Sequence, residues 1–209
     1  MKAGLELSIG IGEISEGMSD EENENSKREK ENDHRTFPKF FLIAAIDEEG
    51  GIGKEGTMPW DFKEDMKYFK ILTKGAGDNF VVMGRKTFES MYCRPLPMRK
   101  NIVITSSEQM QMEHHKPEKN TFILGSIAEA ISLIVRTSCD DVWVIGGASI
   151  YNEFLTNHTD LVDSIYLTHI SDSYECDVHF PCIPSNYTLA RSHQILEKET
   201  LLKFKVYTR

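Results

Sequence analysis

The alternation of apolar and polar positions divides the chain into short hydrophobic runs separated by segments with helical spacing. From residue 37 onward the runs contain hardly a polar residue, which is typical of strands covered on both faces, as in a parallel sheet. We expect strands over 39–46, 79–84, 100–105, 121–125 and 141–147. Helical patterns lie between them, over 61–72, 85–92, 126–135 and 148–155. Short helices between buried strands predict βαβ crossovers and an open α/β sheet.

The last third of the chain has a different pattern. Strands are expected over 163–170, 186–195 and 201–209, with no convincing helix between them. The last two strands are close in sequence, so we expect them to pair antiparallel around the turn LEKET. In open α/β sheets ligands bind beyond the carboxyl ends of the strands. The turns that follow the strands are therefore where a site is expected.

One helical pattern carries a charge on its apolar side. In MPWDFKEDMKYFKIL the apolar stripe consists of Phe62, Met66, Phe69 and Leu72. Asp65 lies on the same stripe. Asp61 and Glu64 have the spacing of a capping box, so the helix is expected to begin at Asp61. Charged residues are rarely buried unless paired, so Asp65 is either a partly exposed edge residue or a buried acid with a special partner.

Two strand-to-helix turns are candidates for phosphate binding. The first, VVMGRKTFES, places Gly84, Arg85, Lys86 and Thr87 at the start of a helix. The second, WVIGGASIYNEFL, places Gly146, Gly147, Ala148 and Ser149 at the start of another. Helix N-termini offer free N–H groups and a partial positive charge. Two such turns in one sheet suit the two phosphates of a dinucleotide, although neither is the G-x-G-x-x-G fingerprint. The alternative is glycine that serves only tight chain reversal.

Two loops add further candidates. In RPLPMRKN, two prolines stiffen the segment before a strand, and Arg99 is placed to bind a carboxylate with its planar fork. A solvated loop cation is the alternative. In GGIGKEGTMPW, four glycines within seven residues precede Pro59 and Trp60. This segment is either a mobile lid or an ordinary flexible connection.

Composition and charge narrow the class of protein. The chain has 209 residues, 40% hydrophobic and 27% charged, which indicates one folded domain with a real core. A net charge of −9 gives no support to nucleic-acid binding. Residues 1–36 hold ten acidic and five basic residues and no aromatic one, so we expect a disordered acidic extension. Within it, LELSIGIGEI alternates and permits a short strand.

The cysteines and the apolar runs bear on metal content and location. Four cysteines occur without a C-x-x-C pair or a histidine cluster, so no metal site is expected. Free thiols in a reducing compartment are the simplest interpretation, and a Cys176–Cys182 bridge remains open. No run is long enough to span a membrane and no secretory signal is evident. We therefore expect a cytoplasmic protein without a membrane or nucleic-acid partner, acting as a monomer.

Taken in order, these motifs resemble those of dihydrofolate reductases. The resemblance rests on IAAID…GIGKEGTMPW, FKEDMKYF, VVMGRKTFES, RPLPMRKNIVIT, VWVIGGASIY, IYLTHI and CDVHFP, and covers 37–209 but not the extension 1–36. It implies a single α/β domain with a mostly parallel sheet of about eight strands, an antiparallel C-terminal strand and helices on both faces. It also implies the NADPH-dependent reduction of dihydrofolate to tetrahydrofolate, within one-carbon metabolism, by an enzyme that antifolates target.

The resemblance assigns a role to residues of a pterin pocket. Asp65 matches the acid that accepts two hydrogen bonds from the ring. Thr168 matches the threonine that supports this acid, and Trp60 the tryptophan that orients a water. The pocket walls match Ile43, Ala44, Met66, Phe69, Met91, Leu96, Ile145 and Tyr151. Arg99 matches the arginine that clamps the α-carboxylate of the substrate's glutamate.

The resemblance also assigns cofactor contacts. Near the nicotinamide it places Ala45, Ile52, Gly53 and Lys54. At the phosphates and the adenosine it places Gly84, Arg85, Lys86, Thr87, Thr105, Ser106, Ser126, Gly146, Gly147, Ala148, Ser149 and Ile150. The Gly146-Gly147 peptide is cis in the family. Arg85 matches a basic residue near the 2′-phosphate of NADPH, whereas some relatives have a cation at Ser106 and many at Gly125.

Two other functions compete with this interpretation. A reductase of pyrimidine intermediates in riboflavin synthesis would share the phosphate-binding turns, but it has no need of the P-W-x4-D helix or of Arg99. A folate- or nucleotide-binding protein without turnover would keep the same polar groups. Oxidation of NADPH in the presence of dihydrofolate separates these cases.

Overall fold

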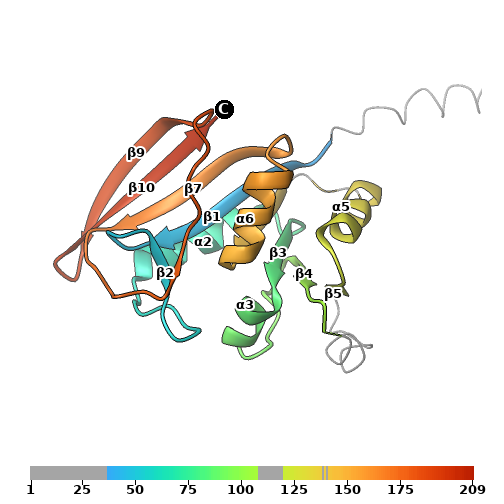
Figure 1. Ribbon diagram of the computed structural model, residues 1–209, viewed down its shortest axis with the longest axis horizontal. Helices are drawn as coiled ribbons and strands as arrows, with labels where there is room; N and C mark the ends of the chain where they lie inside the picture. The colour runs from blue at the N-terminus through green and yellow to red at the C-terminus, as the bar shows by residue number, and fades with distance from the viewer. Residues whose placement is uncertain (1–36, 108–119, 138, 140) are drawn as a thin grey trace, which may run out of the picture. The chain divides into compact units, whose positions relative to one another are not determined.

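The computed structural model describes residues 37–107, 120–137, 139 and 141–209 (Figure 1). The acidic segment 1–36, with the short strand expected in it, lies outside the described residues. The described residues begin at Phe37, where the family resemblance also begins.

An eight-stranded sheet forms the centre of the fold. In spatial order its strands are β5 (Thr121–Leu124), β4 (Lys100–Ile104), β3 (Phe80–Gly84), β6 (Asp141–Gly146), β1 (Lys39–Ile46), β7 (Val162–Ile170), β10 (Thr200–Thr208) and β9 (Thr188–Glu197). The pairs from β5 to β7 are parallel. β10 runs antiparallel to both β7 and β9. The expected α/β fold with antiparallel strands at its C-terminal end is confirmed.

Helices cover both faces of the sheet, which explains the near-absence of polar residues in its strands. α5 (Ile127–Arg136) and α6 (Ala148–Asn157) pack on one face, in a cluster that includes Phe40 and Leu42 of β1. α2 (Lys63–Lys74) and α3 (Arg85–Ser90) contribute to a cluster on the other face, with Phe41 and Ile43. In Figure 1, α6 lies in front of the sheet and α2 behind it. Successive residues of β1 point to opposite faces, so both faces need apolar residues.

A second, two-stranded sheet lies outside the sequence prediction. It pairs β2 (Gly51–Gly53) with β8 (Val178–His179) antiparallel. The glycine-rich segment after β1 is thus anchored to the chain that follows β7. Its proposed motion as a lid stays a prediction.

Two local expectations have opposite outcomes. The capping box of α5 is confirmed, because the Ser126 side chain accepts the N–H of Glu129 at 3.2 Å and the Glu129 carboxylate accepts the N–H of Gly125 at 3.1 Å. The start of α2 at Asp61 is wrong. α2 begins at Lys63, and the residue at its N-cap position, Phe62, forms no side-chain cap.

All four cysteines are free thiols, so the Cys176–Cys182 bridge left open by the sequence does not form. Within the described residues, no helix is long and apolar enough to cross a membrane. The same residues hold no cluster of three or more side chains suited to a metal ion.

Candidate active site

Asp65 is a buried carboxylate in the first turn of α2, with 5% of its surface exposed. Burial raises the pKa of its carboxyl group, while a hydrogen bond with the hydroxyl of Thr168 lowers it, and the negative charge of Glu197 raises it further. Thr168 is itself buried in β7. Asp65 forms no ion pair with any residue that the structure describes. It is therefore an acid whose carboxylate is free to bind a polar partner other than protein.

Several apolar residues predicted to wall the pterin pocket lie in or against one buried cluster. Ile43 of β1 and Ile145 of β6 belong to one buried cluster, and Phe69, Met91 and Leu96 pack against it. Tyr151 of α6 donates its hydroxyl to the carbonyl oxygen of Ile43 at 2.6 Å. Burial and the nearby charge of Asp65 raise the pKa of Tyr151, which places its ring within electrostatic reach of Asp65.

Two predicted wall residues lie apart from this group. Ala44 packs against the cluster on the α5 and α6 face. The side chain of Met66 is 39% exposed and belongs to no buried cluster of the described residues. Both roles stay predictions.

Trp60 lies immediately before α2 and is buried, with its ring 5.2 Å from that of Tyr174 between centroids. Its indole N–H has no hydrogen-bond partner among the described residues. A buried donor without a partner costs free energy, so a ligand or water at this position would stabilise the protein. Ala45 packs in the same cluster, at the carboxyl end of β1.

Arg99 is a buried cation without a carboxylate partner in the described part of the chain; 5% of its surface is exposed. Its Nη1 donates to the hydroxyl of Thr73 at 2.8 Å and its Nε to the carbonyl of Pro97 at 3.1 Å. Burial lowers the pKa of the guanidinium. Thr73 and Asp65 lie eight residues apart on α2, which is about 12 Å along a helix axis. One helix thus sets the spacing between the acid and the cation.

The two glycine turns lie side by side, as the sequence predicted. β3 and β6 are paired, with Met83 opposite Gly146. A Cβ atom at Gly84 would lie 3.2 Å from Cγ1 of Ile150, and one at Gly147 would lie 3.4 Å from Oγ1 of Thr87. The Gly146-Gly147 peptide is cis, as the resemblance implied. Glycine at these two positions keeps open a narrow cradle beside the side chains of Ile150 and Thr87.

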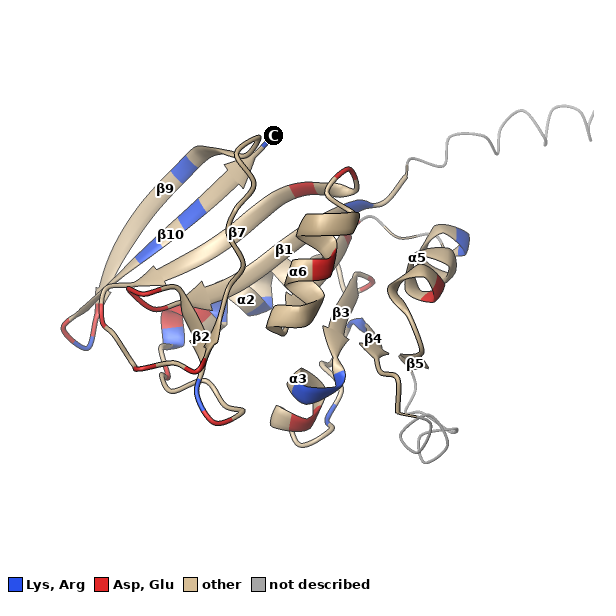
Figure 2. Cartoon of the chain, in the orientation of Figure 1, with Lys and Arg blue, Asp and Glu red and all other residues tan. Residues whose placement is uncertain are grey.

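Cations and hydroxyl groups surround this cradle. Figure 2 shows the basic start of α3 beside the end of β3. Arg85 pairs with Glu89 at 2.6 Å, whereas Lys86 is exposed and forms no ion pair with a described residue. Ala148 and Ser149 open α6, whose N-terminus faces the cradle. The chain therefore fits a bound dinucleotide phosphate group, with Lys86 the cation most free to approach it.

The remaining predicted cofactor residues occupy loops at the carboxyl ends of strands. Thr105 is buried and Ser106 exposed after β4. Ser126 caps α5 after β5, so its hydroxyl is already used. Ile52 and Gly53 belong to β2, and Lys54 pairs with Glu175 at 3.0 Å. These roles stay predictions.

Asp47 is a structural residue that sequence reasoning missed. Its buried carboxylate accepts the N–H groups of Glu49 at 3.0 Å, Gly51 at 2.7 Å and Tyr174 at 3.1 Å. Burial alone would raise the pKa of Asp47, but these bonds and one from the Cys176 thiol outweigh it and lower the pKa. Asp47 thereby joins the glycine-rich segment to the chain after β7. Only an acid followed closely by glycines, in DEEGG, hinted at this role.

Replacing Asp47 by asparagine is expected to lower the free energy of unfolding by about 2 kcal/mol at pH 7. The folded-state pKa is depressed, so the carboxylate stabilises the protein above its ordinary pKa of about 3.9, and this stabilisation is lost as pH falls through the folded-state value. Urea unfolding at neutral and acidic pH measures the difference in free energy of unfolding between the wild type and the variant. This difference is expected to be smaller in acid. Asp160→Asn, at an exposed turn, is the control. A difference independent of pH would contradict this prediction.

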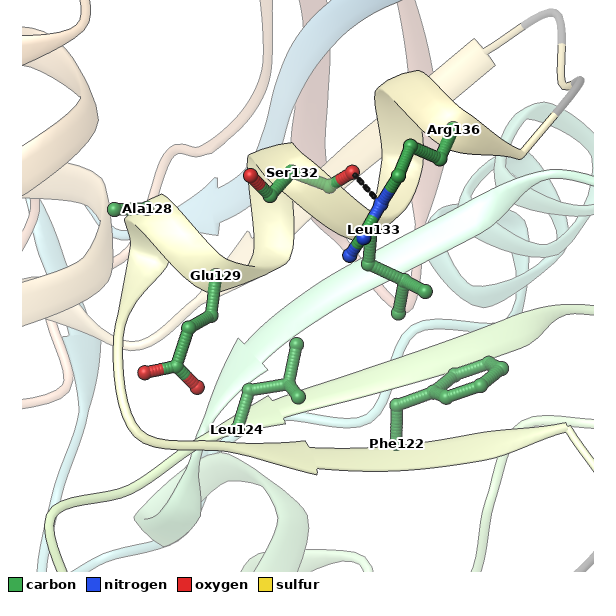
Figure 3. A pocket seen from close by; sticks show the side chains of 7 residues that line it. All are labelled: Phe122, Leu124, Ala128, Glu129, Ser132, Leu133 and Arg136. Atoms are coloured by element: carbon green, nitrogen blue, oxygen red, sulfur yellow. Dashed lines mark hydrogen bonds between the residues drawn. The ribbon is translucent and has the colours of Figure 1, made fainter.

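A hollow of about 510 Å³ lies away from these residues, between β5 and α5 (Figure 3). It is lined by Phe122, Leu124, Ala128, Glu129, Ser132, Leu133 and Arg136. Arg136 donates to the carbonyl of Ser132 within α5 at 3.1 Å. None of the predicted site residues lines the hollow.

The chain matches known proteins over most of its length. Residues 39–209 match the family model described as Dihydrofolate reductase. A dihydrofolate reductase of Aedes albopictus is 34% identical over 171 residues, covering 74% of this chain and 85% of that protein. A putative dihydrofolate reductase of Caenorhabditis elegans is 41% identical over 151 residues, or 68% and 76% of the two chains.

A solved structure agrees with the sequence matches. Dihydrofolate reductase from Enterococcus faecalis, complexed with NADP(H) and RAB-propyl, superposes with a TM-score of 0.69 at 30% identity, covering 82% of this chain and 96% of that one. The fold, the paired glycine turns and the buried acid together define an oxidoreductase of the α/β class that uses a nicotinamide dinucleotide. This chain belongs to the dihydrofolate reductase family.

Proposed function

We propose that the chain catalyses the reaction of its family, the NADPH-dependent reduction of 7,8-dihydrofolate to 5,6,7,8-tetrahydrofolate, and that Asp65 is the residue that binds the pterin ring. The observation that carries this proposal is the buried carboxylate of Asp65, which has a hydroxyl partner in Thr168 but no cation partner among the residues that the structure describes. A pterin edge offers two adjacent N–H donors, which match the two oxygens of a carboxylate in the manner of a guanidinium. Its catalytic domain is proposed to span 37–209, after an acidic extension over 1–36.

NADPH, when bound, supplies the hydride that is added to C6 of the substrate. The glycine cradle formed by Gly84 and Gly147, with Lys86 beside it, would hold the phosphates. The carboxyl end of β1, with Ala45, would hold the nicotinamide end. In this arrangement these residues would align the two reacting rings.

The chain's own residues must also deliver a proton to N5. Asp65, bound to the far edge of the ring, is too distant in this arrangement to donate directly. The unpartnered indole N–H of Trp60 would instead hold a water molecule below Met58, and that water would supply the proton. Asp65 polarises the ring and so makes N5 easier to protonate.

The test is to mix the protein with NADPH and dihydrofolate and follow the absorbance of NADPH. Oxidation that depends on dihydrofolate, and not on a pyrimidine intermediate of riboflavin synthesis, is the expected result. Binding of dihydrofolate without oxidation would favour a binding protein without turnover. Oxidation with the pyrimidine alone would favour the riboflavin-pathway reductase.

Arg99→Lys is expected to raise KM for dihydrofolate about 10-fold with little change in kcat, because lysine cannot form the two parallel hydrogen bonds of a guanidinium with a carboxylate. Steady-state kinetics measure the two parameters. Arg94→Lys, on the exposed part of the same loop, is the matched control. A substrate lacking the glutamate should show the same KM with both variants, and a 10-fold difference with that substrate would contradict the assignment.

We place the enzyme in the cytoplasm as a monomer, where tetrahydrofolate would supply one-carbon metabolism and where antifolates would occupy the Asp65 pocket. Four free cysteines suit a reducing compartment. Cell fractionation and sedimentation test these two proposals.

A further inference from the structure

The helix that carries Asp65 receives no cap from its own segment. The first N–H groups of any α-helix lack partners within the helix. At the start of α2 the N-cap residue Phe62 has φ −112° and ψ 122° and cannot supply a polar side chain. The expected cap, Asp61, forms no hydrogen bond to these groups.

A carboxylate 133 and 134 residues away in sequence takes this place. Oε1 of Glu197 accepts the N–H of Lys63 at 2.9 Å, and Oε2 accepts the N–H of Glu64 at 3.0 Å. Nζ of Lys198 donates to the carbonyl oxygen of Asp61. The turn between β9 and β10 therefore holds the start of α2 at three points. A negative charge at a helix N-terminus is also favourable for the helix dipole.

This contact ties α2 to the strands that present Thr168. Glu197 is the last residue of β9 and is paired with Thr200 of β10. Phe204 of β10 lies opposite Thr168 of β7. The paired strands β9, β10 and β7 thus carry both contacts. Glu197 of β9 holds the first turn of the helix that contains Asp65, and Thr168 of β7 is the hydroxyl partner of Asp65.

We propose that Glu197 is a positioning residue of the pterin site, which fixes the first turn of α2 through its two backbone N–H groups so that the Asp65 carboxylate meets Thr168. The role rests on the proposed binding of the pterin by Asp65. Glu197 would act through α2, since its carboxylate is bonded to the backbone N–H groups of Lys63 and Glu64.

The charges around Asp65 agree with this geometry. Thr168 from β7 and Glu197 from β9 act on Asp65, whose charge in turn acts on Tyr151 of α6. Hydrogen bonds from the N–H groups of Glu64 and Lys63 lower the pKa of Glu197 and keep it ionised at neutral pH. Its negative charge raises the pKa of Asp65. Removing that charge should therefore move the titration of Asp65 to lower pH.

Three variants separate position from charge. Glu197→Gln removes the charge, and the NH2 group of its amide would face one of the two backbone N–H groups of α2, so that two donors oppose each other. Glu197→Asp keeps the charge on a side chain one methylene shorter, which weakens the bidentate contact. Glu199→Gln, on the same turn, removes an equal charge that makes no hydrogen bond to α2 and is the matched control.

Both Glu197 variants are expected to raise KM for dihydrofolate about 5-fold, with KM for NADPH unchanged. In NMR titrations of the ligand-free protein, Glu197→Gln lowers the pKa of Asp65 whereas Glu197→Asp leaves it close to the wild-type value. Glu199→Gln changes neither quantity. The proposal is overturned if Glu197→Gln behaves as Glu199→Gln does, or if both Glu197 variants lower only the melting temperature. The titration needs no substrate, so it judges Glu197 even if the reductase activity is absent.

Discussion

Asp65→Asn is expected to lower kcat/KM for dihydrofolate about 100-fold at neutral pH. An asparagine can accept only one of the two hydrogen bonds from the ring, and its amide would oppose the second ring donor. It also carries no charge to polarise the pterin. Steady-state and single-turnover kinetics measure the loss. Asp61→Asn, an exposed acid four residues earlier, is the matched control and is expected to stay within about 2-fold of wild type.

The same substitution should stabilise the ligand-free protein. The pKa of Asp65 is raised in the folded state by burial, opposed by the bond with Thr168. The ionised acid therefore costs stability above its ordinary pKa of about 3.9, and asparagine removes this cost at pH 7. A higher melting temperature at pH 7, with the gain vanishing in acid, is expected. A rate near wild type at neutral pH would remove Asp65 from the mechanism, whatever the melting temperature.

Gly146→Ala is expected to lower the free energy of unfolding by about 3 kcal/mol and to abolish cofactor binding. Gly146 has φ +110°, a backbone conformation that L side chains rarely adopt, and a Cβ there would lie 3.1 Å from two ring carbons and the hydroxyl oxygen of Tyr151. That ring cannot easily move, because its hydroxyl is bonded to the carbonyl of Ile43 at 2.6 Å. Chemical denaturation and NADPH titration measure the two effects.

Gly50→Ala serves as the control for Gly146→Ala. Gly50 has φ +83°, but a Cβ there would meet nothing within 4 Å. It should therefore cost only about 1 kcal/mol, the cost of the backbone conformation alone. Equal losses at the two positions would show that crowding by Tyr151 has no part in the effect.

The elements that sequence reasoning predicted well are those whose causes are local. The cap of α5 involves Ser126 and Glu129, three residues apart, and each of these side chains accepts a backbone N–H at the start of the helix. The buried strands were evident because helices cover both faces, which leaves almost no polar position in them. The pairing of β9 with β10 followed from their short turn. Each of these features depends on residues close together in the chain.

The elements that were missed depend on partners far away in sequence. The start of α2 was predicted at Asp61, since a capping box is a local pattern, but Glu197 provides the cap and moves the start to Lys63. β2 and β8 have three and two residues, too short for any periodicity, and exist because their backbones pair. Asp47 escaped notice because its partners are backbone N–H groups, which no side-chain pattern reveals.

The candidate site shows the same division. Asp65 was recognised as unusual because it lies on an apolar stripe, and the two glycine turns were recognised because each places glycine between a strand and a helix. The convergence of Asp65, Thr168 and Tyr151 did not follow from any local rule, because they come from α2, β7 and α6. The roles of these three residues came from the family resemblance. For Arg85, which the resemblance places near the 2′-phosphate, the structure adds an ion pair with Glu89.

The central position of β1 has a consequence for biosynthesis. Phe40 of β1 lies opposite Val142 of β6 and Val162 of β7. The two strands that pair with β1 are therefore synthesised only after about a hundred further residues. At about 5–20 residues per second, this strand waits about 5–20 s with its apolar side chains unpaired. During translation the exposed KFFLIAAI is a ready target for chaperones, and Asp65 emerges long before Thr168 can reach it.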